Sequence, residues 1–290
     1  MSPGRSDRRK PAELCGVPHN SFHRASRVCS LEFAYPVAAV NTATRASIVA
    51  IAPVPEAALD YSVVLPLYNE AGNVDLLLTE LREALSNVVG SYEVVLVDDG
   101  SRDETRAAVL REIRNWPECR LVAFRRNQGQ AAALLTGMRQ ARGAVIVTLD
   151  GDGQNVPADI PRVLAALAGA DLVVGARQAR QDSRVRLAMS RVANAVRSRV
   201  LGDAVHDAGC GLKAMRREVV DAFIPIRTLY SFMPALAVAA GYRVVECPVQ
   251  HRARQAGVAN YGLRAFAWRP LVDMIGVWWF TRRRFAGRID

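Results

Sequence analysis

The stretch SVVLPLYNEAGNVDLLLTELREALSNVVGSYEVVLVDDGS, residues 62–101, decides the fold. It begins with an apolar run, Ser62–Leu67, continues with apolar residues every three or four positions across Val74–Leu85, and returns to an apolar run at Glu93–Val97. Apolar runs that alternate with amphipathic stretches are typical of a parallel sheet whose crossover connections are helices. The stretch therefore predicts a strand, a helix and a second, parallel strand.

The same alternation continues through three more strands, and right-handed crossovers between such units predict a doubly wound α/β domain with a mainly parallel sheet flanked by helices. The further predicted strands are Arg120–Phe124, Ala144–Leu149 and Asp171–Val174, and the further predicted helices are Thr105–Arg114, Ala131–Ala141 and Ile160–Leu167. Beyond Asp182 the regular alternation stops, and we expect two helices and one strand there.

The first of these later helices is predicted at Arg184–Leu201. Its apolar residues form one stripe, whereas its arginines spread over the other faces and are expected to bring positive charge close to the site. The stripe consists of Val185, Met189, Val192, Val196 and Val200, and the arginines are Arg184, Arg186, Arg191, Arg197 and Arg199.

Three regions follow from these patterns. Residues 1–58 have no sustained period and are predicted to be a disordered extension. Residues 59–250 carry the α/β pattern, and residues 251–290 form a basic and aromatic C-terminal segment with amphipathic helical character. In this last segment, the aromatic residues Trp268, Trp278, Trp279 and Phe280 precede Arg282, Arg283 and Arg284. We favour contact with an anionic membrane surface; tryptophans that simply cover the sheet are the alternative.

Charge and composition narrow the partners. The 290 residues have a net charge of +10 and a pI near 9.9, which indicates an anionic partner such as nucleic acid, nucleotide phosphates or acidic lipid headgroups. The five cysteines are scattered without a Cys-x-x-Cys spacing, so neither a disulfide framework nor a zinc site is predicted. No secretory signal and no apolar run of about 18 residues is seen, which favours a cytoplasmic protein without a transmembrane helix.

Acidic residues follow the predicted strands. Asp98 and Asp99 come after the second strand, and Asp150, Asp152 and Gln154 come after the fourth. Ligands bind outside the carboxyl ends of parallel strands, and acidic groups gathered there repel one another unless a cation compensates. Carboxylate and amide oxygens at alternate positions suit Mg²⁺ or Mn²⁺, with substrate phosphates completing the coordination. An isolated Asp-x-Asp is often only a solvated turn, but its position after a buried strand favours the metal.

Glu70 and Asp98 precede the metal turn, and they are placed where they can hold a base and a ribose through hydrogen bonds. The alternative for residues 98–101 (DDGS) is a tight turn that caps the next helix. Both roles can coexist.

Together, residues 66–70 (PLYNE), 97–101 (VDDGS), 126–129 (RNQG) and 150–154 (DGDGQ) resemble the family 2 glycosyltransferases, which have the GT-A fold. Further segments look like the dolichol-phosphate and polyprenyl-phosphate sugar transferase branch of that family. These segments are residues 174–177 (VGAR), 190–191 (SR), 207–213 (DAGCGLK), 251–254 (HRAR) and 257–262 (GVANYG). The resemblance covers about residues 61–284.

The resemblance implies an inverting, metal-dependent transfer of a sugar such as mannose or glucose from a GDP- or UDP-sugar to a polyprenyl phosphate, at the cytoplasmic face of a membrane and without a nucleic-acid partner. It implies that Pro66, Tyr68, Glu70, Asp98, Asp99, Gln128 and Asp150 bind the nucleotide sugar, and that Asp150, Asp152 and Gln154 bind Mg²⁺ or Mn²⁺. It assigns catalysis to Asp152, Arg177, Arg191 and Arg254, and acceptor binding to Ser190, Arg252, Asn260 and Tyr261.

A phosphate acceptor is already an anion at neutral pH and needs no strong base, although Asp152 is the residue we would assign if one is required. The guanidinium groups of Arg177, Arg191 and Arg254 are suited to bind phosphate oxygens through two parallel hydrogen bonds.

Departures from the family pattern leave alternatives open. Ala253 stands where the family often has Pro, Ala259 where it has a polar residue, and Tyr230-Ser231 where a His-Arg pair is expected. A transferase with a different acceptor, or an inactive nucleotide-binding relative, therefore remains an alternative. A basic nucleic-acid-binding protein would explain the charge but not the acidic strand ends. A nicotinamide dehydrogenase is disfavoured because no Gly-x-Gly-x-x-Gly turn follows an early strand.

Overall fold

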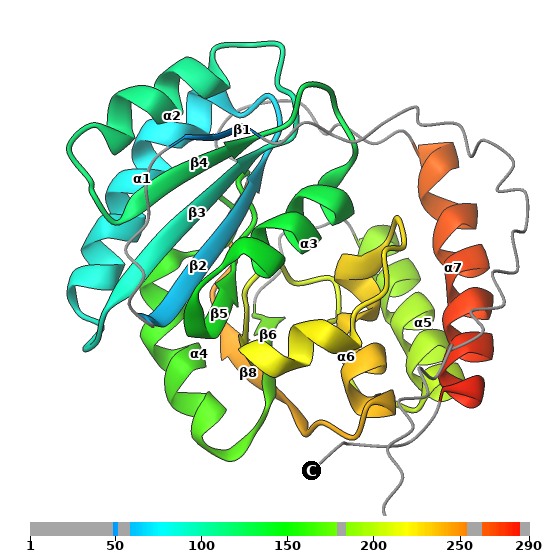
Figure 1. Ribbon diagram of the computed structural model, residues 1–290. Coiled ribbons are helices and arrows are strands. Elements are labelled where there is room, and N and C mark those ends of the chain that lie inside the picture. Colours follow the sequence, from blue (N-terminus) through cyan, green and yellow to red (C-terminus); the bar gives the residue numbers. More distant parts are fainter. Residues whose placement is uncertain (1–48, 52–58, 179–183, 254–262, 285–290) are drawn as a thin grey trace, which may run out of the picture. The chain divides into compact units, whose positions relative to one another are not determined.

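The computed structural model describes residues 49–51, 59–178, 184–253 and 263–284 (Figure 1). These residues form an eight-stranded sheet in the order β1-β4-β3-β2-β5-β7-β6-β8. The strands are β1 (Val49–Ile51), β2 (Leu59–Leu67), β3 (Tyr92–Asp98), β4 (Cys119–Ala123), β5 (Gly143–Thr148), β6 (Leu172–Arg177), β7 (Lys213–Arg216) and β8 (Val244–Val249).

Helices connect and cover these strands. They are α1 (Ala71–Ser86), α2 (Thr105–Ile113), α3 (Gln130–Gln140), α4 (Ile160–Ala166), α5 (Arg184–Leu201), α6 (Leu229–Ala239) and α7 (Leu263–Arg283), with short 3-10 turns at Pro157–Asp159, Leu167–Gly169 and Arg217–Ala222. The five strands and four helices predicted before residue 182 are all confirmed, with ends that shift by a few residues.

The order in which the chain adds strands to the sheet reverses at β2, in the middle of the sheet. From β2 the chain first moves outward through β3 and β4, and it then returns to the other side of β2 to form β5, with parallel pairing throughout. The carboxyl ends of β2, β3 and β5 therefore lie side by side at a switch point, which is where open α/β sheets bind ligands.

The second half of the sheet differs from the prediction. β7 lies between β5 and β6 and is antiparallel to both, and β8 pairs in parallel with β6. Beyond Asp182 the described residues hold three α-helices and two strands rather than two helices and one strand. The prediction missed β7 because this strand has only four residues, KAMR, and two of them are a lysine and an arginine.

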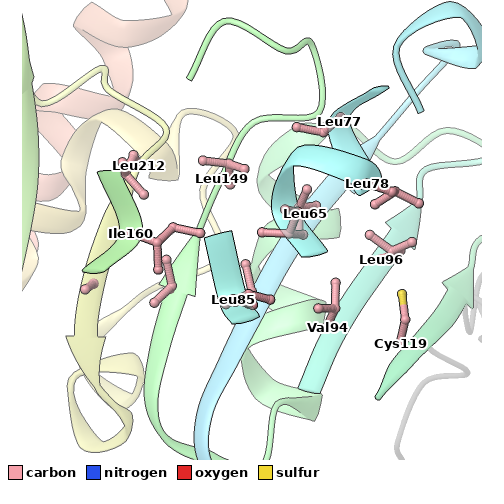
Figure 2. Close-up of a cluster of buried hydrophobic side chains, with 14 of the residues drawn as sticks. Leu65, Leu77, Leu78, Leu85, Val94, Leu96, Cys119, Leu149, Ile160 and Leu212 are labelled. Atoms are coloured by element: carbon pink, nitrogen blue, oxygen red, sulfur yellow. The ribbon is translucent and has the colours of Figure 1, made fainter. Parts of the chain in front are cut away.

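Two apolar layers cover opposite faces of the sheet. Val63 and Leu65 of β2 point into a cluster with α1, α2 and α4, in which Leu77 and Leu85 of α1 also lie (Figure 2). Val64 points into the opposite cluster, which α3 and α6 cover. Successive residues on one strand serve both layers, because side chains of a strand alternate between faces. This explains why the strand reads as an uninterrupted apolar run.

The N-terminal edge strand is a further difference. β1 pairs in an antiparallel manner with β4 at Val49↔Ala123 and Ile51↔Leu121. These three residues fall within the segment 1–58 for which no regular structure was predicted; Val and Ile have side chains suited to a strand. The rest of that segment, residues 1–48 and 52–58, lies outside the described residues.

Helices α5 and α7 contact each other and leave apolar side chains exposed. On α5 these are Val192, Val196 and Val200, and on α7 they are Leu271, Val272, Ile275, Trp278 and Trp279. The guanidinium groups of Arg282 and Arg283 lie over the rings of Trp278 and Trp279, at 4.7 and 5.4 Å from the ring centroids. Among the described helices, none combines the length and apolar character required to cross a bilayer.

Candidate active site

The loop that follows β2 is fastened to the loop that follows β3. Asn69 adopts a left-handed conformation with φ 55°, which Asn tolerates better than most residues. The backbone N–H of Asn69 donates to Ser101 Oγ at 3.0 Å, and that of Glu70 donates to Thr105 Oγ1 at 2.7 Å. Pro66 and Tyr68 therefore lie at a switch-point edge whose backbone is held from the neighbouring strand.

Glu70 is buried at the beginning of α1, where its carboxylate accepts a hydrogen bond of 2.5 Å from Asn73 Nδ2. This contact belongs to the first turn of the helix. The predicted role of Glu70 in nucleotide binding stays a prediction.

Asp98 and Asp99 both receive hydrogen bonds from the protein. Asp98 is fully buried and accepts from the Ser101 N–H at 2.9 Å and from Arg106 Nε at 2.8 Å. These contacts fit the tight turn before a helix that the sequence analysis gave as the alternative for residues 98–101. Nucleotide binding by Asp98 remains a prediction.

Asp99 holds the predicted RNQG segment in place. Its carboxylate accepts hydrogen bonds from Asn127 Nδ2 at 2.9 Å, from the Gln128 N–H at 2.7 Å and from the Gly129 N–H at 2.9 Å. Burial raises the pKa of Asp99, against the lowering effect of the Gln128 and Gly129 hydrogen bonds. Gln128 is thereby positioned through its backbone, next to the beginning of α3.

Asp150 lies directly after β5 and has an unfavourable environment for a carboxylate. Burial, and after it the charge of Asp152, raises its pKa to about 6, although Lys213 and Arg177 act in the opposite direction. Gln130 Nε2 donates to Asp150 Oδ1 at 2.9 Å. A side chain at Gly211 would overlap the Asp150 carboxylate, so only glycine leaves room for it.

Residues 150–154 form an acidic loop, which is fastened by Arg252. Asp152 Oδ1 accepts from the Gln154 N–H at 3.1 Å, and Gly153 has φ 71°. The Gln154 carbonyl accepts from the Arg252 N–H at 3.0 Å, and the Gly153 carbonyl accepts from Arg252 Nε at 2.5 Å. The predicted metal residues Asp150, Asp152 and Gln154 are thus carried by one short turn.

Arg177 ends β6 and is paired with Asp207. Its Nε and Nη2 donate to the two carboxylate oxygens at 2.7 Å each, and its backbone N–H donates to the same group at 3.1 Å. Asp207 is itself held by Glu246, whose carboxylate accepts from the backbone N–H groups of His206 and Asp207. Arg177 is therefore held at the end of β6, where its charge acts on Asp150.

Lys213 is a residue of this site that the sequence interpretation did not single out. It begins β7, is almost fully buried and donates to the carbonyl of Cys210. Burial lowers the pKa of its ammonium, while the charge of Asp150 supports the protonated form. Its position within the quoted DAGCGLK segment was the available signal, but the antiparallel strand that buries it was not predicted.

Among the arginines predicted on α5, Arg197 makes a structural contact. Arg197 is buried, donates to Asp203 Oδ2 at 2.8 Å and to the Val205 carbonyl at 2.6 Å, and so ties α5 to the loop that carries Asp207. The valines of the predicted stripe that the structure describes face outward. Ser190 and Arg191 belong to the same helix. Arg254, Asn260 and Tyr261 lie outside the described residues.

The donors present fit a hard divalent cation. Asp150 and Asp152 supply carboxylates, Gln154 supplies an amide, and the raised pKa of Asp150 indicates uncompensated cost that a cation would relieve. In the part of the chain that the structure describes, no cluster of three or more His, Cys, Asp or Glu side chains is arranged to hold a metal. Phosphate oxygens of a bound donor would add further ligands to such a site.

Comparison with known proteins supports this interpretation. Residues 62–223, more than half of the chain, match the family model "Glycosyl transferase family 2". An undecaprenyl-phosphate 4-deoxy-4-formamido-L-arabinose transferase of Edwardsiella ictaluri is 41% identical over 205 residues, which are 70% of this chain and 63% of that protein. Its counterpart in Pseudomonas fluorescens is 40% identical, over 69% of this chain and 59% of that protein. The chain thus spans less than two thirds of these relatives.

Solved structures agree with the fold. A mannosyltransferase from Pyrobaculum calidifontis, in complex with GDP-Man and Mn²⁺, has a TM-score of 0.59 and 25% identity over 81% of this chain and 68% of its own. A glucosyl-3-phosphoglycerate synthase from Mycobacterium tuberculosis has a TM-score of 0.58 and 21% identity over 77% of this chain and 79% of its own. The predicted GT-A fold and the predicted family are both confirmed: the chain belongs to glycosyl transferase family 2.

Proposed function

We propose that this protein is an inverting, metal-dependent glycosyltransferase that moves a sugar from a nucleotide donor to a polyprenyl phosphate. The observation that carries the proposal is the arrangement at the carboxyl end of β5, where Asp150 and Asp152 share one turn and Arg177 and Lys213 lie close enough to stabilise the Asp150 carboxylate. Such a site combines groups for a cation with groups for phosphate, as a diphosphate donor requires.

The acceptor class is supported by the relatives. Both relatives described above are named as undecaprenyl-phosphate 4-deoxy-4-formamido-L-arabinose transferases, and the family model matches the region that contains Asp150, Arg177 and Lys213. We therefore propose undecaprenyl phosphate as the acceptor. The sugar is a hexose such as mannose or glucose, or the 4-deoxy-4-formamido-L-arabinose of the relatives' names, carried on GDP or UDP.

The residues divide the chemical work as follows. An oxygen of the acceptor phosphate bonds to the anomeric carbon while the bond from that carbon to the diphosphate breaks, and the electron pair leaves with the diphosphate. Attack from the opposite side inverts the configuration. When bound, Mg²⁺ or Mn²⁺ supplies Lewis-acid stabilisation of the diphosphate charge. Asp150, Asp152 and Gln154 hold the cation, and Arg177 binds phosphate oxygens by its guanidinium.

The nucleotide lies over the ends of β2 and β3 in this proposal. Pro66, Tyr68, Glu70 and Asp98 line that edge, and Asp99 presents Gln128 through the hydrogen bonds described above. Arg191, Arg254, Ser190, Asn260 and Tyr261 are proposed to contact the acceptor and its phosphate, on the basis of the family resemblance.

A lipid acceptor also calls for contact with a membrane surface, which we assign to α7. Ile275 and Trp279 are exposed there, and Arg282 and Arg283 stack on the neighbouring tryptophans. Exposed aromatic and aliphatic side chains beside cations suit the interface of an anionic bilayer. Co-sedimentation with anionic vesicles tests this assignment. We expect the double variant Trp279→Ala, Ile275→Ala to sediment with the vesicles less than wild type, and equal sedimentation of the two proteins would contradict the assignment.

The decisive test of the activity is turnover with undecaprenyl phosphate in the presence or absence of Mn²⁺ or Mg²⁺. The donors are GDP-mannose, UDP-glucose, UDP-N-acetylglucosamine and nucleotide-linked 4-deoxy-4-formamido-L-arabinose. We expect Asp152→Ala to lower kcat by about 1000-fold, because the loss of a group that stabilises charge in the transition state has effects of that order. Asp75→Ala, which removes an exposed aspartate of α1, is the control and should keep full activity.

Two results would contradict the proposal. One is the absence of transfer from every donor by folded wild-type protein that binds Mn²⁺, which would favour the inactive-relative alternative or another acceptor. The other is a product that retains the anomeric configuration of the donor, which would exclude a single inverting displacement.

A further inference from the structure

Arg252 connects the acidic loop to helix α1. Its Nη1 and Nη2 donate to the two carboxylate oxygens of Glu80 at 2.7 and 2.6 Å, and its Nε donates to the carbonyl of Gly153 at 2.5 Å. Glu80 and Arg252 are 172 residues apart in the sequence. Three segments, α1, the acidic loop and the chain after β8, therefore meet at one guanidinium group.

The backbone strengthens this connection. The Arg252 N–H donates to the Gln154 carbonyl at 3.0 Å, and Asn155 and His251 form an isolated antiparallel bridge. Just before this point, the Gln250 N–H donates to Asp159 Oδ2 at 2.6 Å. The chain that leaves β8 thus runs alongside residues 153–159, and the side chain of Arg252 is directed across the acidic loop to α1.

Glu80 is suited to hold the far end of this connection. It lies on α1 between Leu77 and Leu81, which are buried in the core and make the helix a rigid support. The Glu80 and Arg252 side chains are about three-quarters buried, with exposed fractions of 25% and 26%. A bidentate ion pair that is partly shielded from water has more effect than a fully exposed one.

The acidic loop also has a hydrogen bond within its own turn. Gly153 has a positive φ, and the hydrogen bond from the Gln154 N–H to Asp152 Oδ1 is local. An Arg252 variant would lose the hydrogen bond from Nε to the Gly153 carbonyl and the ion pair with Glu80, whereas the backbone N–H of residue 252 would still donate to the Gln154 carbonyl. The link that joins the turn of Asp152 and Gln154 to helix α1 would then be absent.

We propose that Glu80 and Arg252 are positioning residues for the acidic loop, which hold Asp152 and Gln154 in the orientation that receives a divalent cation together with Asp150. This inference rests on the proposed function for the metal itself. Groups that orient metal-binding side chains without touching the metal commonly change metal affinity by about 10- to 100-fold when they are lost. It gives Arg252 a role beside the acceptor contact that the family resemblance implies.

Hydrogen exchange in the full-length protein without metal or donor tests the positioning directly. In Glu80→Gln, we expect the backbone amides of Gln154 and Arg252 to exchange about three- to tenfold faster than in wild type, because the ion pair that anchors the loop is broken. Asp75→Asn is the matched control: Asp75 lies on the same helix and forms a bidentate pair with Arg111, but that pair is exposed and joins α1 to α2. It should leave both amides unchanged.

A second readout is Mn²⁺ affinity without donor, measured by the electron paramagnetic resonance signal of free Mn²⁺. We expect Glu80→Gln to weaken binding by about tenfold, whereas Asp75→Asn should have no effect. Arg252→Lys keeps a charge for Glu80 but lacks the fork that also reaches Gly153, and it should show an intermediate loss. If Glu80→Gln does not fold, Glu80→Asp, which keeps the charge on a shorter side chain, replaces it with a smaller expected effect.

Unchanged exchange of Gln154 and Arg252 in a folded Glu80 variant would overturn the positioning role, as would Mn²⁺ affinity equal to that of wild type. Both measurements are independent of sugar transfer. If wild type transfers no sugar but the exchange and affinity changes occur, the proposed reaction fails while the positioning role stands.

Discussion

Two acidic pairs occupy equivalent places in this sheet and have opposite surroundings. Asp98 ends β3 and Asp99 follows it, and the two receive hydrogen bonds from Arg106, from Asn127 and from backbone N–H groups. Asp150, after β5, is half-buried near Asp152 and has a pKa raised to about 6. The aspartates at the end of β3 therefore fasten loops through several hydrogen bonds from the protein, whereas Asp150 and Asp152 are the pair that we propose to bind a cation. The surroundings, rather than the residue type, distinguish the two roles.

The largest expected effect of the second pair is on the pH dependence of the free energy of unfolding. The folded pKa of Asp150 is about 6, above its ordinary value of 3.8, so the folded protein binds the proton more tightly than the unfolded chain does. Ionisation of Asp150 therefore lowers the free energy of unfolding as pH rises from about 4 to about 6, by roughly 3 kcal/mol at most, with no further loss above that range.

Urea denaturation at a series of pH values, in EDTA, measures this effect. Asp150→Asn should lack the decline, so the difference between variant and wild type should grow from pH 4 to pH 6 in favour of the variant. Addition of Mn²⁺ should restore the stability of wild type above pH 6, because a cation that binds only the folded state stabilises it. Parallel pH profiles for the two proteins would contradict an unfavourable carboxylate at this position.

Asp98→Ala tests the first pair, whose carboxylate should stabilise the folded protein. The buried carboxylate accepts two hydrogen bonds that hold the turn before α2, and its loss leaves the Ser101 N–H without this partner. We expect a loss of about 2 kcal/mol in the free energy of unfolding at pH 7. Asp152→Ala, at a half-buried position in the loop of the second pair, should lose far less. Equal losses in the two variants, measured by urea denaturation, would remove the distinction between the pairs.

Most of the first half of the fold was predictable because each strand there is buried on both faces. Residues 62–67 read as an apolar run, and β2 indeed serves two apolar layers. β7 was not predictable from the same rule: it begins with Lys213, whose burial depends on neighbouring strands and on the Cys210 carbonyl rather than on local sequence.

Helix α5 illustrates a second limit. Its period correctly predicts a helix with one apolar side, but a period does not say which side faces the core. Val192 and Val196 are exposed, and Arg197 is buried against Asp203. The period did not indicate that Arg197 is buried, because a charged side chain with a buried partner can belong to the interior.

The candidate site was predictable where its residues are neighbours in the sequence and not where they meet through folding. The spacing of Asp150, Asp152 and Gln154 indicated one turn, which the structure contains. The contacts of Asp207 with Arg177 and of Glu80 with Arg252 join residues 30 and 172 positions apart. Such pairs depend on the sheet order, which the sequence alone did not establish beyond the fourth strand.

A titration with Mn²⁺ tests the central claim most directly. The protein is titrated with the donor nucleotide GDP or UDP present, and free Mn²⁺ is followed by its paramagnetic resonance signal, in wild type, Asp150→Asn and Asp99→Asn. We expect wild type and folded Asp99→Asn to bind about one Mn²⁺, and Asp150→Asn to bind at least about tenfold more weakly, because only the second acidic pair coordinates the cation. Unchanged binding by Asp150→Asn, or an equal loss in Asp99→Asn, would contradict the assignment of the metal to the end of β5.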